Sequence, residues 1–534
     1  MNPVQRSLPQ NSLVHLQQLE ADVEARRQDV RGLENALLEA RQRCADAEKT
    51  LASLKFSLSA LSRFPTEILC HLFQCCVDGD RTGHALTMRA MPWVLSRICR
   101  AWREIVIYTP SLWRVIRIDM GERHVQNPAS LVKTYLTRSQ PLPISCMLNL
   151  QDSFEPHDRK VVKTIMKASK RLQDIDFDLG SRADIYTELV ETHGTLRLPL
   201  LQGLRIVVSE FADGEDGEDL APGLVPMPVC GQFSFASSLV EAHVEFPNFS
   251  LPLVLLPWEK LTELYCPFHD FGDMEEVARG ARNVVNWYIN FRWDDQDIHN
   301  IYAADEPVLI PHLQHLNLRG RCSILGPVLD RFVAPNLEDL ALHHTYYQEI
   351  GTCHDADSIF TAIANLQTRS CCTLRRLTAP LPLFSTPLAI GLHSVEELHA
   401  SLPVFNTERR LYSEAFANMK EKKLLAGMRT LHLDLQRASE ARSFLVFQRF
   451  LDIASTRRRW DSSSRLERLS FWANNREVPI PLDMPSVEKL SELRKDGMVM
   501  LGDIVDGTWC SAYKNLIWKS DITKEERRSM KFLL

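Results

Sequence analysis

The residue types that most often perform chemistry are present in this sequence without the spacing that chemistry requires. The chain contains no GxSxG nucleophile turn, no HExxH zinc helix and neither of the phosphate loops GxxxxGK[ST] and GxGxxG. Its densest group of metal-ligand types is LHHTYY at 342–347, followed by CHDAD at 353–357. These residues follow an expected strand end, where solvated polar side chains are common. We therefore expect no metal, no cofactor and no catalytic activity.

The composition is that of an ordinary globular protein with reduced thiols. Of 534 residues, 45% are hydrophobic and 24% are charged, which allows several domains or one extended array. The net charge of −6 provides no basic field for phosphate backbones, so we expect no nucleic-acid partner. Thirteen cysteines without CxxC spacing do not indicate a disulfide framework. Without a secretory leader or a long apolar run, we expect a cytoplasmic or nuclear protein that is not secreted and has no membrane partner.

A heptad repeat occupies residues 16–61. Its seam alternates steps of three and four through Leu16, Leu19, Val23, Arg26, Val30, Leu33, Leu37, Ala40, Cys44, Ala47, Leu51, Leu54, Leu58 and Leu61. Arg26 is the single charged member. This pattern predicts a coiled-coil helix over 1–61 that forms a homodimer or pairs with another helix. The alternative is a solitary amphipathic helix lying on the rest of the protein.

The heptad pattern ends before residues 62–118, and the sequence of this segment predicts a small three-helix unit. Pro65 and Glu67 suit the first turn of a helix, and the glycine-rich stretch VDGDRTGHA at 77–85 ends it. A second helix is expected after Pro92, and Thr109 can cap a short third one. A unit this small commonly gains stability from a partner.

Beyond residue 170 one motif recurs, in which an apolar residue is followed three positions later by a second and two positions after that by a third. The copies are LQDIDF at 172, LQGLRI at 201, LVEAHV at 239, LTELYC at 261, VVNWYI at 284, LQHLNL at 313, LEDLAL at 337, LRRLTA at 374, VEELHA at 395, MRTLHL at 428, LERLSF at 466 and a doubtful VEKLSE at 487. The alternating tail of each copy suits a half-buried strand, and helix-like stretches such as 159–170 and 442–455 fill some intervals. Strand, loop, helix, loop is the unit of a leucine-rich-repeat solenoid.

The expected fold class is therefore multidomain, α plus α/β, with parallel strands in an irregular solenoid. We assign 119–170 to a linker and the first repeat helices, 171–500 to the irregular leucine-rich-repeat array and 501–534 to a C-terminal cap or tail. The intervals between copies range from 21 to 38 residues, and the asparagine that usually follows the strand is absent from nearly every copy. The acidic stretch 210–223 predicts a solvated loop, and the basic run at 455–465 predicts a solvated helix end.

The segments LSRFPTEILCHLF, VLSRICRAWREIVI and TPSLWRVIRI together resemble an F-box. The order of coiled coil, F-box and irregular leucine-rich repeats resembles the F-box-like proteins abundant in mushroom-forming fungi. The family often has Leu-Pro where this chain has Phe64 and Pro65, a change that keeps the position apolar. The family's F-box binds the Skp adaptor and, through it, a cullin with a RING subunit and a ubiquitin-conjugating enzyme. The resemblance thus implies a non-catalytic substrate receptor of a ubiquitin ligase.

The resemblance also implies which residues contact the adaptor. They are Phe64, Pro65, Ile68, Leu69, Leu72 and Phe73, with Ile98, Cys99, Trp102, Leu112 and Trp113 shaping the same helical surface. The alternative is that the last five form the internal core, and we favour it for Cys99 and Trp102. A further alternative function is a coiled-coil and leucine-rich-repeat scaffold that never engages a cullin.

In such a horseshoe the residues between the apolar strand positions face the concave side. The candidates for substrate binding are Gln314, His315, Asn317, Glu338, Asp339, Ala341, Arg375, Arg376, Thr378, Arg429, Thr430 and His432. Their mixture of charges favours an unknown protein substrate over a lipid or a nucleic acid. For any single residue, the simpler interpretation is a solvent-facing side chain.

Overall fold

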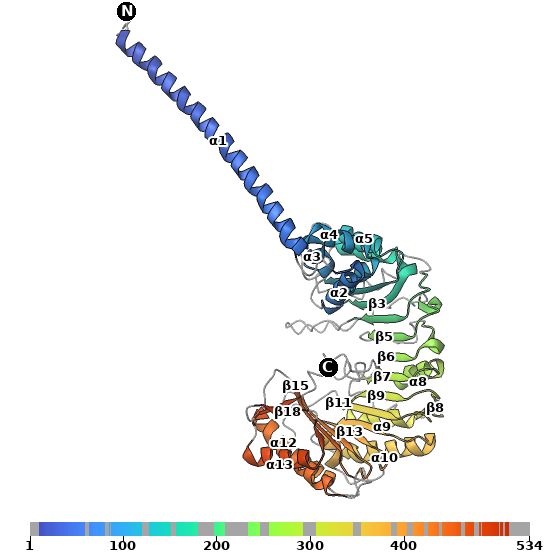
Figure 1. Ribbon diagram of the computed structural model, residues 1–534. Coiled ribbons are helices and arrows are strands. Elements are labelled where there is room, and N and C mark those ends of the chain that lie inside the picture. The colour runs from blue at the N-terminus through green and yellow to red at the C-terminus, as the bar shows by residue number, and fades with distance from the viewer. Residues whose placement is uncertain are drawn as a thin grey trace, which may run out of the picture.

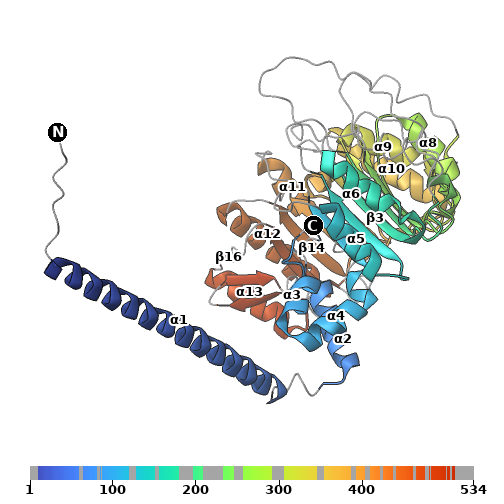
Figure 2. The same ribbon diagram turned by 90° about the horizontal axis from the view of Figure 1, so that it is seen from above.

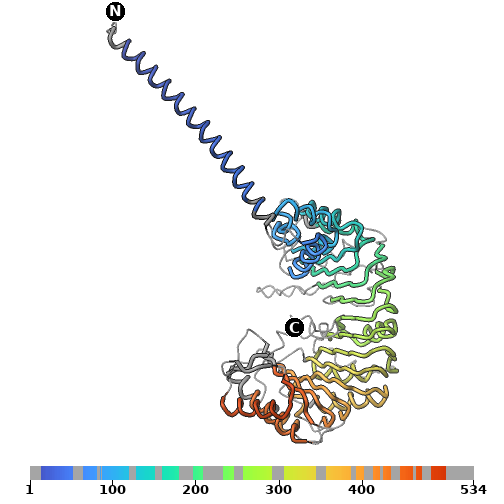
Figure 3. The backbone as a smooth tube through the Cα atoms, in the orientation of Figure 1, coloured from blue at the N-terminus to red at the C-terminus, as the bar shows by residue number. Residues whose placement is uncertain are grey.

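An extended N-terminal helix and a curved body make up the molecule (Figures 1 and 3). A computed structural model describes residues 10–58, 64–80, 85, 87–119, 128–150, 156–179, 197–208, 233–245, 256–291, 306–344, 354–385, 392–402, 409–420, 425–436, 440–460, 465–474, 480–481, 483–500, 502–505 and 508–511. The expected acidic loop at 210–223 lies outside these residues. No helix in the described ranges is long and apolar enough to cross a bilayer.

Helix α1 (Gln10–Leu58) has 49 residues and a length of about 74 Å. Exposed ion pairs such as Arg26 with Asp22 at 3.4 Å join successive turns on its surface. Figures 1 and 2 show the helix projecting away from the body. Its seam is open to solvent in the single chain from Leu16 to Leu54, and the Leu37 side chain is 52% exposed. Within the described part of the chain no residue of the body covers the seam, so the alternative of a helix lying on the body is wrong.

A compact helical unit follows α1. It consists of α2 (Thr66–Gly79), α3 (Met91–Ile98), α4 (Arg100–Tyr108) and the 3₁₀ helix η2 (Pro110–Trp113). The expected second helix is two helices, because Cys99 is extended (φ −157°, ψ 172°) and its Sγ accepts a bond from the amide of Trp102 at 3.4 Å. The core of the unit comprises Leu69, Phe73, Val77, Leu95, Val106, Leu112 and Trp113. Trp113 Nε1 donates to the Val106 carbonyl at 2.7 Å, so its indole is satisfied inside this core.

Fourteen parallel strands form one sheet, and their order along the sheet is their order in the sequence. The first seven are β1 (Val115–Asp119), β2 (Ile144–Asn149), β3 (Leu172–Asp178), β4 (Gly203–Val207), β5 (Glu241–Glu245), β6 (Glu263–Phe268) and β7 (Asn286–Phe291). The second seven are β9 (His315–Gly320), β11 (Asp339–His344), β12 (Arg376–Pro380), β13 (Glu397–Leu402), β14 (Thr430–Gln436), β15 (Arg468–Asn474) and β17 (Val499–Met500). Each strand pairs with the next along the chain, which is the topology of a solenoid.

Eleven of the twelve expected motif copies coincide with strands β3 to β15 of this sheet. Each of these strands begins within two residues of the first apolar residue of its copy, and the three apolar positions are buried. The doubtful copy at 487 is wrong, because it lies in helix α13 (Met484–Lys495). Asp483 caps this helix by accepting a bond from the Ser486 amide at 3.0 Å, so a local capping signal overrides the strand-like spacing.

The sheet begins earlier than the expected array at residue 171. Strands β1 and β2 precede that point, and β1 continues directly from the helical unit. Trp113 takes the first apolar position of a motif that continues with Ile116 and Ile118, both buried. Trp113 also packs edge to face on Tyr135 of α5 (Pro128–Arg138), with ring centroids 5.0 Å apart. The helical unit and the array therefore share one continuous core.

Helices cover the outer side of the sheet, where Figure 1 shows α8, α9 and α10. The remaining helices are α6 (Pro156–Met166), α8 (Phe271–Gly280), α9 (Cys322–Asp330), α10 (His354–Ser370), α11 (Arg409–Lys420) and α12 (Glu440–Arg458). The helix-like stretches at 159–170 and 442–455 are thereby confirmed in α6 and α12. Short 3₁₀ helices are η3 (Ser169–Arg171), η4 (Phe233–Phe235), η6 (Trp258–Lys260) and η8 (Leu381–Ser385).

Two small sheets accompany the large one. Strands β8 (Val308–Leu309) and β10 (Phe332–Val333) pair in parallel. Strands β16 (Ile480–Pro481), β18 (Gly502–Val505) and β19 (Thr508–Ser511) form an antiparallel sheet. Strands β18 and β19 lie in the region 501–534 where a C-terminal cap or tail is expected, whereas β16 lies within the bounds expected for the array.

Arginines join the ends of neighbouring helices in the array. Arg171 donates to the Leu136 carbonyl in the last turn of α5 at 2.9 Å, and Arg369 donates to the Leu329 carbonyl in the last turn of α9 at the same distance. Arg457 donates to the Met419 carbonyl near the end of α11 at 2.7 Å. Each arginine therefore pairs with a carbonyl group near the end of a helix in a neighbouring repeat, where intrahelical partners are few.

The expectation of a solvated basic run at 455–465 is wrong for two of its arginines. Arg457 is fully buried, and burial lowers the pKa of its guanidinium to about 10. Arg458 is also buried and donates to the Asp496 carboxylate at 2.9 Å. Both side chains reach backbone or carboxylate partners in neighbouring repeats, which a local sequence pattern does not reveal.

The exposed seam of α1 predicts that the full-length chain self-associates. Leu37→Glu places a charge in the seam and should weaken association about tenfold or more, because burying a leucine contributes about 1.5 to 3 kcal/mol. Leu38→Glu is the matched control, since Leu38 is 71% exposed and lies outside the heptad seam. Analytical ultracentrifugation measures the mass of each. A monomeric wild type, or equal effects of the two variants, would contradict the prediction.

Candidate functional site

The first candidate surface is the outer side of α2. Phe64, Ile68 and Leu72 are spaced by four residues and are 43%, 46% and 40% exposed. We call these three residues the α2 strip. Ile68 and Leu72 share one side of α2 because residues four apart lie on the same face of a helix, and Phe64 lies just before the helix, which begins at Thr66. The opposite side, with Leu69 and Phe73, is buried in the core of the unit.

The structure divides the residues expected at the adaptor contact into two groups. Those on the surface are Phe64, Pro65, Ile68, Leu72 and Ile98. Those buried in the core are Leu69, Phe73, Leu112 and Trp113, which support the surface from beneath and do not reach it. Trp102 is half-buried with its ring 4.7 Å from Phe73, and Cys99 caps α4, which agrees with the internal roles that we favour for both. Whether the exposed residues bind an adaptor stays a prediction.

The second candidate surface is the concave side of the sheet between β9 and β15. Strand register places residues of different repeats side by side on this face in two rows. The first row is His315, Asp339, Arg376, Glu397, Thr430 and Arg468. The second row is Asn317, Ala341, Thr378, His399, His432 and Ser470. The expected candidates in these rows thus share one face, and their role in binding a substrate stays a prediction.

Four other expected residues lie at the edge of this face. Gln314, Glu338, Arg375 and Arg429 each precede a strand by one residue and are exposed. Their backbone carbonyls accept bonds from the start of the next strand, as Glu338 does from Arg375 and Arg376 at 2.8 and 3.0 Å. Their backbones therefore align the repeats, while their side chains remain available to solvent.

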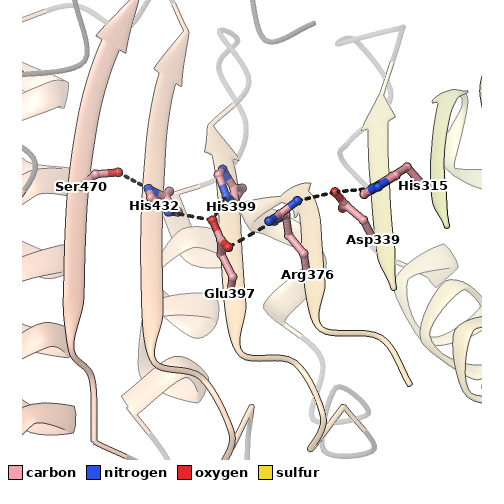
Figure 4. A network of polar contacts seen from close by, with 7 residues as sticks. All are labelled: His315, Asp339, Arg376, Glu397, His399, His432 and Ser470. Carbon is pink, nitrogen blue, oxygen red and sulfur yellow. Dashed lines mark hydrogen bonds and ion pairs between the residues drawn. The ribbon is translucent and has the colours of Figure 1, made fainter. Parts of the chain in front are cut away.

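A chain of polar contacts crosses the two rows (Figure 4). At its centre, Arg376 donates from Nη1 to Asp339 Oδ2 at 2.9 Å and from Nε to Glu397 Oε2 at 3.1 Å. His315 Nδ1 lies 3.3 Å from Asp339 Oδ2 at one end. Burial lowers the pKa of Arg376, but the two carboxylates outweigh it and hold that pKa above its ordinary value. Arg376 is therefore a fixed cation within the face.

Two histidines meet Glu397 at the other end of the chain of contacts. His399 Nε2 lies 2.8 Å and His432 Nε2 lies 3.1 Å from the same atom, Glu397 Oε1. The two imidazole rings stack with centroids 4.0 Å apart, and His432 Nδ1 contacts Ser470 Oγ. Burial by itself would raise the pKa of Glu397, but its bonds to the histidines hold that pKa well below the usual range. Burial and the neighbouring His399 lower the pKa of His432 to about 4, so this histidine is neutral at pH 7.

The concave face continues with aromatic side chains toward the N-terminal repeats. His243, Tyr265 and Tyr288 follow one another in the same row as Asn317. The His243 and Tyr265 rings lie 3.8 Å apart, and the Tyr265 and Tyr288 rings lie 6.2 Å apart. Tyrosine and arginine are the residue types enriched at the energetic centres of protein interfaces.

Sequence reasoning missed Glu397, His399 and Ser470. The copy VEELHA at 395 places Glu397 and His399 at the positions that His315 and Asn317 occupy in their own copy, so comparing equivalent positions could have found them. These side chains come from neighbouring strands that are far apart in the sequence, so they do not form a cluster of metal-ligand types along the chain. Of the LHHTYY cluster, residues 345–347 lie outside the described residues. His343 contacts Asn317 at 3.4 Å, and burial lowers its pKa to about 4.

Neither a protein-family model nor a curated protein sequence matches this chain. The resemblance to F-box proteins consequently rests on the residues of α2, α3, α4 and η2. The geometry of these helices and of the concave face is the basis for any functional conclusion.

The depressed pKa values of His432 and His343 predict a loss of stability in acid. Between pH 6.5 and about 4, both histidines are protonated in the unfolded chain but remain neutral in the folded chain. The free energy of unfolding therefore falls as the pH falls. His432 should account for up to about 3 kcal/mol of this loss. Urea unfolding with a chelator present should therefore show a smaller decline for His432→Gln than for the wild type, and likewise for His343→Gln. An equal decline in all three proteins would contradict the assignment.

Proposed function

We propose that this protein is the substrate-recognition subunit of a cullin-RING (SCF-type) ubiquitin ligase. In this proposal the helical unit binds a Skp adaptor, which connects it to a cullin, and the concave face of the solenoid binds a protein substrate. The α2 strip is the observation that carries the proposal. It combines an exposed apolar face with the residues that resemble the start of an F-box.

The α2 strip has the physical properties of an interface rather than of a solvated helix. Phe64, Ile68 and Leu72 each keep nearly half of their surface in water, although α2 and its N-terminus are anchored by the buried Leu69 and Phe73. Covering this remaining surface would contribute roughly 1 kcal/mol per residue. Ile98, also exposed, lies at the end of α3, which packs beside α2 in the unit. An apolar partner surface is the occupant that gains most from this face.

The rest of the chain supports separate roles for the helical unit, which would bind the adaptor, and the solenoid, which would bind the substrate. Because the helical unit shares its core with the first repeats through Trp113 and Tyr135, a substrate on the concave face would be held at a defined position relative to the adaptor. The exposed seam of α1 favours a second candidate function, a self-associating scaffold that does not engage a cullin. Binding of adaptor and cullin distinguishes the two functions.

Charged substitutions in the α2 strip test the adaptor contact. Ile68→Glu with Leu72→Glu should reduce co-purification of the Skp adaptor about thirtyfold or more, the loss that accompanies removal of an interface hot spot. Leu69 is unsuitable for this test because it is buried, and its substitution would disturb folding.

Leu309→Glu with Met484→Glu is the matched control. Both residues are exposed and apolar, and they lie in β8 and α13, outside the helical unit. The control should retain both adaptor and cullin. If the Ile68 and Leu72 variant is folded, as judged by circular dichroism, and still retains the adaptor, the adaptor assignment is wrong. A wild type that captures neither adaptor nor cullin would favour the scaffold.

A second pair of variants tests the concave face as the substrate site. Ala341→Arg adds a long side chain in the middle of the second row without removing any polar contact there, so it should block a docked substrate. Ala364→Arg is the control, because Ala364 is exposed on α10 on the outer side of the array. Proximity labelling with and without proteasome inhibition should reveal a protein that accumulates with the wild type and the control but several-fold less with Ala341→Arg. Equal labelling by all three proteins would show that the repeats do not select the substrate.

A further inference from the structure

Glu397, His399 and His432 form a compact group of metal-ligand atoms on the concave face. One ligand atom from each lies within 4.8 Å of the other two. Within the described part of the chain, no other three residues of these types come this close. Two imidazole nitrogens point at a single carboxylate oxygen, at 2.8 and 3.1 Å (Figure 4). Glu397 and His399 come from β13 and His432 from the adjacent β14.

We propose that these three residues bind a divalent transition-metal ion, with zinc as the best match, and that the fourth coordination position opens toward the concave side. Two imidazoles and one carboxylate are a ligand set that zinc accepts, and three protein ligands leave one position for water or for a side chain of a bound protein. This inference does not depend on the proposed ligase function.

The distances suit an ion after a small adjustment. Zinc lies about 2.0 to 2.2 Å from nitrogen and oxygen ligands, so ligand atoms at the corners of a tetrahedron are about 3.3 Å apart. The two nitrogen to oxygen distances must therefore lengthen by a few tenths of an ångström. Rotation of the half-buried imidazoles about their side-chain bonds supplies this without moving the strands, whose register is fixed by the ladder between β13 and β14.

The neighbours of the group orient its ligands as outer partners do in metal sites. Arg376 Nε holds Oε2 of Glu397, which leaves Oε1 for the ion. Ser470 Oγ faces Nδ1 of His432. Metal binding moves the His432 proton from Nε2 to Nδ1, and the serine hydroxyl then accepts a bond from Nδ1 instead of donating one. Both tautomers of His432 are thus paired.

The charges around the group also suit a dication. Glu397 and Asp339 bring two negative charges and Arg376 brings one positive charge, so the sum is −1 before the ion binds. The guanidinium lies between the two carboxylates and bonds to the Glu397 oxygen that does not face the histidines. It therefore offsets one of the two negative charges without occupying the position of the ion.

Zinc titration of the full-length, chelator-treated chain tests the site by calorimetry, and cobalt(II) tests it by visible absorption. We expect one ion per chain. His399→Gln and His432→Gln should each weaken binding about a hundredfold or more, and Ser470→Ala about 10- to 100-fold, the range measured for outer partners. His315→Gln is the matched control, because it removes a histidine that pairs with a carboxylate on the same face but faces no second imidazole. It should leave the affinity unchanged.

Two results would overturn the inference. One is the absence of saturable binding near one zinc per wild-type chain, and the other is equal affinity in the wild type and in folded His399→Gln and His432→Gln. If the variants fail to fold, X-ray absorption of the wild-type zinc complex decides the question without them. Its spectrum should contain two imidazole ligands, and a spectrum without imidazole would reject the site.

Discussion

The structure depends on one constraint, that each repeat can bury its apolar residues only against its two neighbours. Fourteen strands in sequence order satisfy it by placing equivalent residues in register, so that Leu316, Leu340 and Leu377 form one continuous buried row. The same period of two sends the intervening residues to the opposite face. The buried rows and the concave rows are therefore two consequences of a single pattern.

Stacked repeats must also satisfy the backbone carbonyls at their helix ends. Arginines from adjoining repeats perform part of this task. Arg171 reaches the last turn of α5, Arg369 that of α9 and Arg457 that of α11. Their long side chains tolerate different separations, which explains how an array with irregular intervals keeps its strands in register.

The elements that could be predicted from sequence are those determined by nearby residues. The strands follow from apolar spacing within six positions, as at Leu313, Leu316 and Leu318, and the long α1 follows from an uninterrupted heptad pattern. Two of the misses have non-local causes. The burial of Arg457 depends on carbonyls more than thirty residues away, and the meeting of Glu397 with His432 depends on strand pairing. The sequence predicted the adaptor residues as one set. Only the structure shows that Leu69 and Phe73 are buried and support the surface, whereas other members of the set are exposed.

The central functional claim is that the α2 strip is covered by a Skp adaptor. Hydrogen-deuterium exchange of the full-length chain, alone and with purified adaptor and cullin, tests it directly because the measurement needs no substitution. We expect slower exchange at residues 64–76 and along α3 when the adaptor is present, with the exchange of strands β9 to β15 unchanged. Unchanged exchange throughout α2 at saturating adaptor, or protection confined to α1, would contradict it.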